Sequence, residues 1–325
     1  MSLSTTVRFR TDSSNPIVRS SVLKVLFMKI IVPVDGSVYS NNAVSFITHR
    51  TSLIGKDPTI VLVNVQPHLP ARALGLASPE TLQVFYKEEF DKTLGEARKI
   101  LQNAGMKYEE VTLVGNPADM IAEEAEKLGA DLIVMGSHGH TAMEGLLFGS
   151  VTNGVLAQTK TPVLMLRGKE IPHADHLKVG VAVDGSEFST KAVEYMLAHR
   201  ALFGQQAQYE VISAVYDEPN MFMMPAPGLS LMGLTKEKLE LLQKEKFAIA
   251  TEPTKPLFEK AGINAKEVLL IGNPGEEIGQ YAASSNLDVL VLGSHGYGRF
   301  MSAVMGSTAM RIAHASNVPL LIVRQ

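Results

Sequence analysis

The chain contains no cysteine, no long apolar run and no excess of basic residues. Without cysteine there is no disulfide framework, thiolate nucleophile or cysteine-ligated metal site. No apolar run approaches the roughly 18 residues that a membrane-spanning helix needs. The net charge of −3 provides no basic field to attract nucleic acid. We therefore expect a cytoplasmic protein with neither membrane nor nucleic acid as partner, whose chemistry comes from backbone, carboxylate, hydroxyl and imidazole groups.

The length and composition favour two globular domains. At 325 residues the chain exceeds one ordinary domain of about 100–200 residues. Hydrophobic residues make up 46% and charged residues 19%, which is typical of globular proteins. Residues 1–27 differ, because they are rich in serine and arginine and superficially resemble a transit peptide. We interpret them as a disordered arm or a mis-assigned start, since Met28 directly precedes a strand-like segment.

An internal repeat organises the rest of the chain. The segment Val32–Ser37 (VPVDGS) returns as Val181–Ser186 (VAVDGS), and Asp131–Gly139 (DLIVMGSHG) returns as Asp288–Gly296 (DVLVLGSHG). From Pro117 onward the two copies align without a gap. A repeat of this length indicates a duplicated domain.

We place the boundaries of the two copies from these matches. The first domain is expected at 28–168 and the second at 177–325, joined by a short linker at 169–176. So short a linker keeps the domains adjacent, and we expect them to pack as a pseudo-twofold pair within the chain through their final strands, Val163–Leu166 and Leu320–Val323. A further homodimer is left open.

Each copy alternates apolar strands with helical segments, which predicts parallel sheets with right-handed crossovers. The fold class is therefore α/β, with two tandem doubly wound, Rossmann-like domains. Asn116 and Asn273, each followed by proline, and Ser37 predict helix N-caps. A long charged helix is expected over Thr81–Asn103. The predicted strands of the first copy are Ile30–Val34, Ile60–Val65, Glu110–Val114, Leu132–Met135 and Val163–Leu166.

The groups able to bind a ligand cluster where strands end. In the first copy the fourth strand is followed by Gly136, Gly139, Gly149 and Ser150, and the second copy repeats this spacing. Glycines at a strand exit let backbone N–H groups approach an anion, and a helix that opens with Gly-Ser adds its unpaired N–H groups. The alternative is that these glycines only make tight turns.

Asp35 and Asp184 end the first strand of each copy, beside the expected crevice of a doubly wound sheet. A carboxylate in that position can accept hydrogen bonds from ribose hydroxyls. The alternative is an Asp-Gly-Ser turn in which the aspartate satisfies nearby N–H groups at the start of a helix.

With these motifs the sequence resembles the universal stress protein family, in its tandem, nucleotide-binding form, over nearly all of 28–325. The resemblance implies five-stranded, adenine nucleotide alpha hydrolase-like domains that bind ATP, with or without Mg²⁺. In the first copy it assigns the ribose to Asp35, the adenine to the backbone of Val65, and the phosphates to Gly136, Gly139, Gly149, Ser150 and Val151. In the second copy it assigns Asp184, Val215, Gly293, Gly296, Gly306, Ser307 and Thr308.

Three functions remain open from the sequence. The favoured one is an ATP-binding regulatory protein of the stress response, with an unidentified protein partner. The second is a slow ATPase or self-phosphorylating protein, for which His138 and His295 are candidate phosphate contacts or general bases. The favoured interpretation of both histidines is a loop-packing or hydrogen-bonding role. The third is a nucleotide-free, pseudo-dimeric scaffold. Without a P-loop or a kinase signature, we expect no efficient catalysis and at most weak ATP hydrolysis.

Two further expectations concern metals and a loop. The histidines show no metal-ligand spacing shared by the copies, so no dedicated metal site is predicted. In the second copy a methionine-rich segment, 220–234, follows the second strand. It either fills gaps in the core or forms a lid or partner surface, and we favour the lid or partner surface.

Overall fold

The computed structural model of the protein describes residues 28–50, 59–70, 78–139, 148–167, 176–204, 206–216, 236–294 and 306–324. These residues form two compact units, and the division falls between Thr161 and Pro162. The expectations for residues 1–27, for most of the predicted linker and for the methionine-rich segment 220–234 lie outside the described residues. Within the described residues, no helix is long and apolar enough to cross a membrane.

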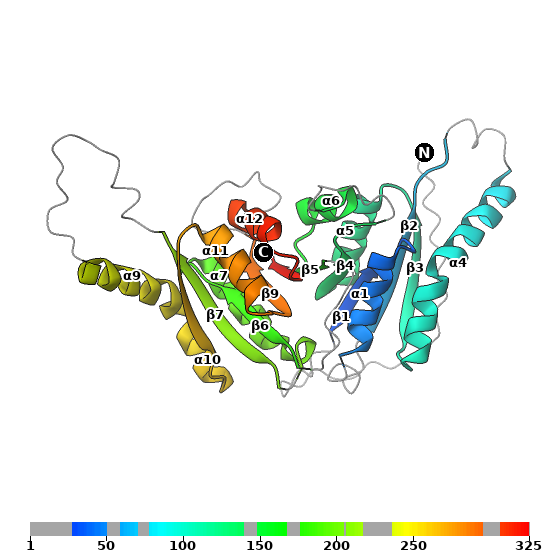
Figure 1. Ribbon diagram of the computed structural model, residues 1–325. Helices are drawn as coiled ribbons and strands as arrows, with labels where there is room; N and C mark the ends of the chain where they lie inside the picture. Colours follow the sequence, from blue (N-terminus) through cyan, green and yellow to red (C-terminus); the bar gives the residue numbers. More distant parts are fainter. Residues whose placement is uncertain are drawn as a thin grey trace, which may run out of the picture. The chain divides into compact units, whose positions relative to one another are not determined.

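The first unit is a four-stranded parallel sheet in the order β3-β2-β1-β4 (Figure 1). Helix α1 packs against α4, and α5 packs against α6. The order in which the chain adds strands reverses after β3, and the connections are right-handed. These two helix pairs therefore cover opposite faces of the sheet. The elements are β1 (Lys29–Pro33), α1 (Val38–Thr48), β2 (Thr59–Gln66), α4 (Pro79–Asn103), β3 (Tyr108–Val114), α5 (Pro117–Leu128), β4 (Leu132–Gly136) and α6 (Ser150–Gln158).

The second unit repeats this arrangement and adds one strand, in the order β5-β10-β9-β6-β7-β8. Helix α7 packs against α10, and α11 packs against α12. The elements are β5 (Val163–Leu166), β6 (Lys178–Ala182), α7 (Glu187–Ala198), a 3₁₀ turn (Arg200–Leu202), β7 (Gln208–Val215), α9 (Lys236–Thr251), a second 3₁₀ turn (Glu252–Thr254), α10 (Lys255–Ala261), β8 (Lys266–Ile271), α11 (Pro274–Ser284), β9 (Val289–Gly293), α12 (Ser307–Ala315) and β10 (Leu320–Val323).

Strand β5 is the last strand of the first repeat, yet it belongs to the second unit. It pairs antiparallel with β10, with Leu164 opposite Leu321, whereas β10 pairs parallel with β9. The prediction that the final strands of the two repeats meet is therefore confirmed. The pseudo-twofold packing of whole domains stays a prediction.

The fold follows from local signals that the sequence carries. Strands β1 and β4 are buried almost throughout, as expected for a sheet covered on both faces. The side chains of Ser37, Asn116 and Asn273 accept hydrogen bonds from the first helical turns, which confirms the predicted N-caps. Gly129 ends α5 with φ +59°, a left-handed conformation that glycine adopts without strain.

The helix that follows the second strand differs between the repeats. In the first repeat α4 is continuous, but in the second its counterpart is divided into α9 and α10 by the 3₁₀ turn Glu252–Thr254. Pro253 and Pro256 lie at this division, and each lacks the N–H that an α-helical bond requires. The buried hydroxyls of Thr251 and Thr254 donate instead to carbonyls three residues earlier.

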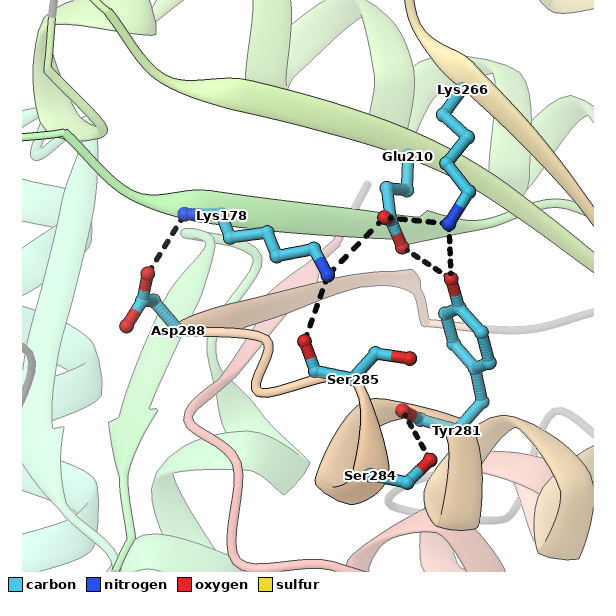
Figure 2. A network of polar contacts seen from close by, with 7 residues as sticks. All are labelled: Lys178, Glu210, Lys266, Tyr281, Ser284, Ser285 and Asp288. Atoms are coloured by element: carbon cyan, nitrogen blue, oxygen red, sulfur yellow. Dashed lines mark hydrogen bonds and ion pairs between the residues drawn. The ribbon is translucent and has the colours of Figure 1, made fainter.

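A buried carboxylate joins three strands and a helix at the amino end of the second sheet. Glu210 accepts from Tyr281 Oη at 2.8 Å and from Lys266 Nζ at 3.3 Å, and Lys178 Nζ lies 3.4 Å away (Figure 2). Burial raises the pKa of this carboxyl, but the bonds from Tyr281 and Lys266 and the charge of Lys178 outweigh it, so its pKa is lowered overall. Register places Val61 at the equivalent position of the first repeat.

We expect Tyr281→Phe to lower the free energy of unfolding by about 1–3 kcal/mol, because a buried carboxylate oxygen then loses its donor. Urea unfolding followed by circular dichroism measures this loss. A Glu210→Val protein carries valine at this position, as the first repeat does at Val61. In that protein Tyr281→Phe should leave the free energy of unfolding almost unchanged. Equal losses in the two backgrounds would contradict the assigned interaction.

Glycine allows the first helix of each repeat to approach the fourth strand. A Cβ added to Gly136 would lie 2.9 Å from the backbone carbonyl of Tyr39 on α1, and one added to Gly293 would lie 2.8 Å from that of Phe188 on α7. Such distances are shorter than van der Waals contact allows. Both glycines are therefore required by packing, whatever else they do.

We predict that Gly136→Ala lowers the free energy of unfolding by about 1–3 kcal/mol, the usual cost of overpacking. Its matched control is Gly95→Ala on α4, where an added Cβ meets nothing within 4 Å. That control should be neutral or stabilising by about 0.5–1 kcal/mol, because alanine suits a helix better. Thermal unfolding without nucleotide measures both effects. Equal melting temperatures of the two variants would contradict this prediction.

Candidate functional site

The carboxyl ends of β1 and β4 lie next to each other in the first sheet, because these strands pair in parallel. Asp35 follows β1, and the loop Ser137–Gly139 follows β4. The ideal Cβ of Gly139 would collide with the carboxylate of Asp35. The structure thus brings two predicted site residues, Asp35 and Gly139, into direct proximity, and a side chain at Gly139 would require the Asp35 carboxylate to move.

The two aspartates hold similar positions in their units, and each caps the following turn. Asp35 Oδ1 accepts from the Ser37 N–H at 3.0 Å, and Asp184 Oδ1 accepts from the Ser186 N–H at 3.0 Å. Both side chains are exposed. Asp184 Oδ1 also accepts from Ser186 Oγ at 2.5 Å. The turn-forming role considered from the sequence is therefore present, while the exposed carboxylates remain accessible to a ligand.

The loop after β4 is fastened to the start of α6. The Gly149 N–H donates to the Ser137 carbonyl at 2.8 Å, and the buried hydroxyl of Thr152 lies 3.2 Å from the Gly136 carbonyl. Gly149 is the N-cap of α6, where Ser150 and Val151 follow. The predicted glycines, Ser150 and Val151 of the first repeat are thereby brought to one place beside Asp35.

Helices α6 and α12 begin differently from those that start with a serine or asparagine cap. Gly149 and Gly306 are their N-caps, and neither helix has a side-chain cap. Helices α1, α4, α5, α7 and α11 each have a serine or asparagine side chain that accepts from the first turn. Within the part of the chain that the structure describes, no side chain caps the first N–H groups of α6 and α12, and such groups bind water or an anion.

The second unit supplies the same groups as far as it is described. Asp184 follows β6, Gly293 ends β9, and Gly306, Ser307 and Thr308 open α12. Ser307 and Thr308 are exposed at the helix start. Gly296 and His295 lie outside the described residues.

Strand register corrects one correspondence between the repeats. Lys29 pairs with Thr59 in the first sheet, and Lys178 pairs with Gln208 in the second. Counted from these pairs, the counterpart of Val65 is Ala214, and Val215 corresponds to Gln66. The carbonyls of Gln66 and Val215 accept equivalent bonds, from Gly115 and Gly272. Val65 and Val215 are therefore not equivalent, although both lie at the carboxyl end of the second strand.

His138 is held within the loop. Its Nδ1 lies 2.9 Å from Ser137 Oγ, and its ring centroid lies 5.7 Å from that of Tyr39. These contacts fit the loop-packing role that the sequence favoured. They also hold the imidazole next to Gly139 in the same loop.

Sequence reasoning missed a chain of amide contacts beside the first site. Buried Asn64 donates to the Val34 carbonyl at 2.5 Å, and Gln66 Nε2 donates to Asn64 Oδ1 at 3.0 Å and lies 3.3 Å from Thr93 Oγ1. The chain supports the backbone just before Asp35. An asparagine inside an otherwise apolar strand was the signal available in the sequence.

No cluster of metal-ligating side chains occurs in the parts of the chain that the structure describes. A divalent cation accompanying a nucleotide would need few protein ligands, because Mg²⁺ retains waters and binds phosphate oxygens.

Two kinds of comparison with known proteins support the family resemblance seen in the sequence, one with a family model and one with individual relatives. The model of the universal stress protein family matches residues 26–167 and 176–324. A universal stress protein of Mycobacterium tuberculosis is 26% identical over 304 residues, covering 91% of this chain and 97% of its own length. One from Methanocaldococcus jannaschii is 35% identical over 154 residues, covering 47% of this chain and 88% of its own.

A solved structure extends the similarity to the fold. The crystal structure of a universal stress protein from Archaeoglobus fulgidus is similar with a TM-score of 0.63 at 20% identity, covering 93% of this chain and 98% of that one. The two matches of the family model together span most of the sequence. The chain therefore belongs to the universal stress protein family and carries two of its α/β, Rossmann-like domains in tandem.

Proposed function

We propose that each repeat binds ATP beyond the carboxyl ends of its strands, and that the protein regulates a stress response through nucleotide-dependent conformation or partner binding. The observation that carries this proposal is that α6 and α12 occupy the same place in the two repeats and both begin at a glycine without a side-chain cap. Helices α1, α4, α5, α7 and α11 begin instead with a serine or asparagine cap.

Packing against the described residues does not explain these two glycines. Among those residues, the nearest atom to a Cβ added to Gly149 lies 3.6 Å away, and the nearest to one added to Gly306 lies 3.8 Å away. Their φ angles, −66° and −59°, are open to every residue. A close ligand explains them better, because a missing side chain leaves the helix N–H groups accessible to phosphate oxygens.

With the phosphates at these helix N-termini, the other site residues take the following roles. Asp35 and Asp184 would accept hydrogen bonds from the ribose, and the backbone at Val65 would meet the adenine of the first site. Gly136, Gly139, Gly149, Ser150 and Val151 would line the phosphates. When Mg²⁺ accompanies ATP, it would neutralise phosphate charge. The cytoplasm is the proposed compartment.

Calorimetry should find two nucleotide sites on the intact chain. Gly149→Asp should abolish the first, because a carboxylate then occupies the phosphate position at a helix N-terminus, and Gly306→Asp should abolish the second. Gly149→Ala is the control for folding, since an added Cβ meets no described atom closer than 3.6 Å. At about 100 times the dissociation constant, ATP should add roughly 2.7 kcal/mol per site to stability.

Two results would count against this proposal. If ATP, ADP and AMP all leave the melting curve unmoved, the nucleotide-free scaffold becomes the better interpretation. If one stoichiometric site disappears in only one of the two aspartate variants, the other repeat is structural.

We expect ATP hydrolysis to be slower than about one turnover per second, below the ordinary enzyme range. The sequence carries neither a P-loop nor a kinase signature that would position an attacking nucleophile. The imidazole of His138, whose Nδ1 lies 2.9 Å from Ser137 Oγ, is the candidate general base of the ATPase alternative. Phosphate release by the purified protein measures the rate. Slow release that His138→Ala abolishes would favour the ATPase alternative, whereas faster turnover would refute the expectation.

A further inference from the structure

Arg167 carries a buried guanidinium and directly follows β5, the last strand of the first repeat. It is only 5% exposed, and β5 is anchored by its pairing with β10. Its two terminal nitrogens donate to carbonyls of the second repeat, Nη1 to that of Ser316 and Nη2 to that of Ala313 at 2.6 Å. These partners lie 149 and 146 residues away in the sequence.

Both acceptors belong to the carboxyl end of α12. This helix runs from Ser307 to Ala315, and Ser316 is its C-cap. The carbonyls of a last helical turn have no N–H partner within the helix, and a cation there interacts favourably with the helix dipole. Burial lowers the pKa of Arg167 to about 10, so the group remains charged at neutral pH.

The other end of α12 is the uncapped N-terminus at Gly306. At 1.5 Å per residue, the nine-residue helix is roughly 13 Å long, short enough to move as one rigid body. Ala309, Ile312 and Ala313 bury one face of it. Because Arg167 holds the last turn of α12, it also fixes the direction in which the N–H groups of the first turn point.

We propose that Arg167 is a positioning residue for the second nucleotide site, holding α12 so that its N-terminus faces the phosphates. The inference rests on the proposed function of the second repeat. It assigns to the first repeat a residue that sets the nucleotide affinity of the second. A positive charge at the carboxyl end and an anion at the amino end also stabilise the same helix dipole.

The test measures each site alone in the full-length protein. Gly149→Asp leaves the second site as the reporter, and Gly306→Asp leaves the first. Adding Arg167→Met should weaken ATP binding about 5- to 10-fold at the second site, a modest coupling between distant groups. Binding at the first site should change less than about twofold, which lies within ordinary context effects. Arg167→Lys should recover part of the loss, because lysine keeps the charge but not the two-armed donor.

The matched control is Arg324→Met, which removes the arginine that follows β10 at the corresponding place. It should leave the affinity of the second site unchanged. Partial unfolding would lower the number of sites per chain, whereas mispositioning lowers the affinity of sites that are still counted. Calorimetry reports the two quantities separately.

The outcomes distinguish the two proposals. If the Gly149→Asp protein with intact Arg167 binds no nucleotide, the proposed function of the second repeat fails and this inference fails with it. If that protein binds ATP and Arg167→Met leaves its affinity unchanged, or weakens the two sites equally, only the positioning role is overturned.

Discussion

The constraint on which the site depends is the right-handedness of strand-helix-strand connections. In each repeat the strand order reverses after the third strand, so that the fourth strand pairs with the first, as β4 does with β1 and β9 with β6. Because the connections on both sides of this reversal are right-handed, their helices lie on opposite faces of the sheet, and this is where doubly wound sheets bind their ligands. Asp35 and Asp184 follow the first strands and the glycine loops follow the fourth, so the topology gathers them.

Different glycines serve different physical purposes at this crevice. Gly136 and Gly293 admit a neighbouring helix, Gly139 makes room for the Asp35 carboxylate, and Gly149 and Gly306 leave helix N–H groups uncovered. From their spacing in the sequence, these five glycines belong to one repeated motif. The structure divides them into residues needed by the fold and residues whose lack of a side chain suits a ligand.

Much of the fold could be predicted from the sequence, because strand burial and helix caps are local properties. The predicted helix Thr81–Asn103 nearly coincides with α4, and the N-caps at Asn116 and Asn273 were right. The match of Val65 with Val215 failed because register is set by hydrogen bonds between strands, which the order of residues does not specify. The Glu210 cluster was missed for the same reason, since its members come from separate elements.

The pairing of β5 with β10 has a consequence for solubility. A strand at the border of a sheet presents unpaired N–H and C=O groups, and such a border invites association with other chains. In the second unit β5 covers the side of β10 that β9 leaves open. Fusion of the repeats thus supplies each molecule with its own protective strand, at an effective concentration that no dilution of the protein can lower.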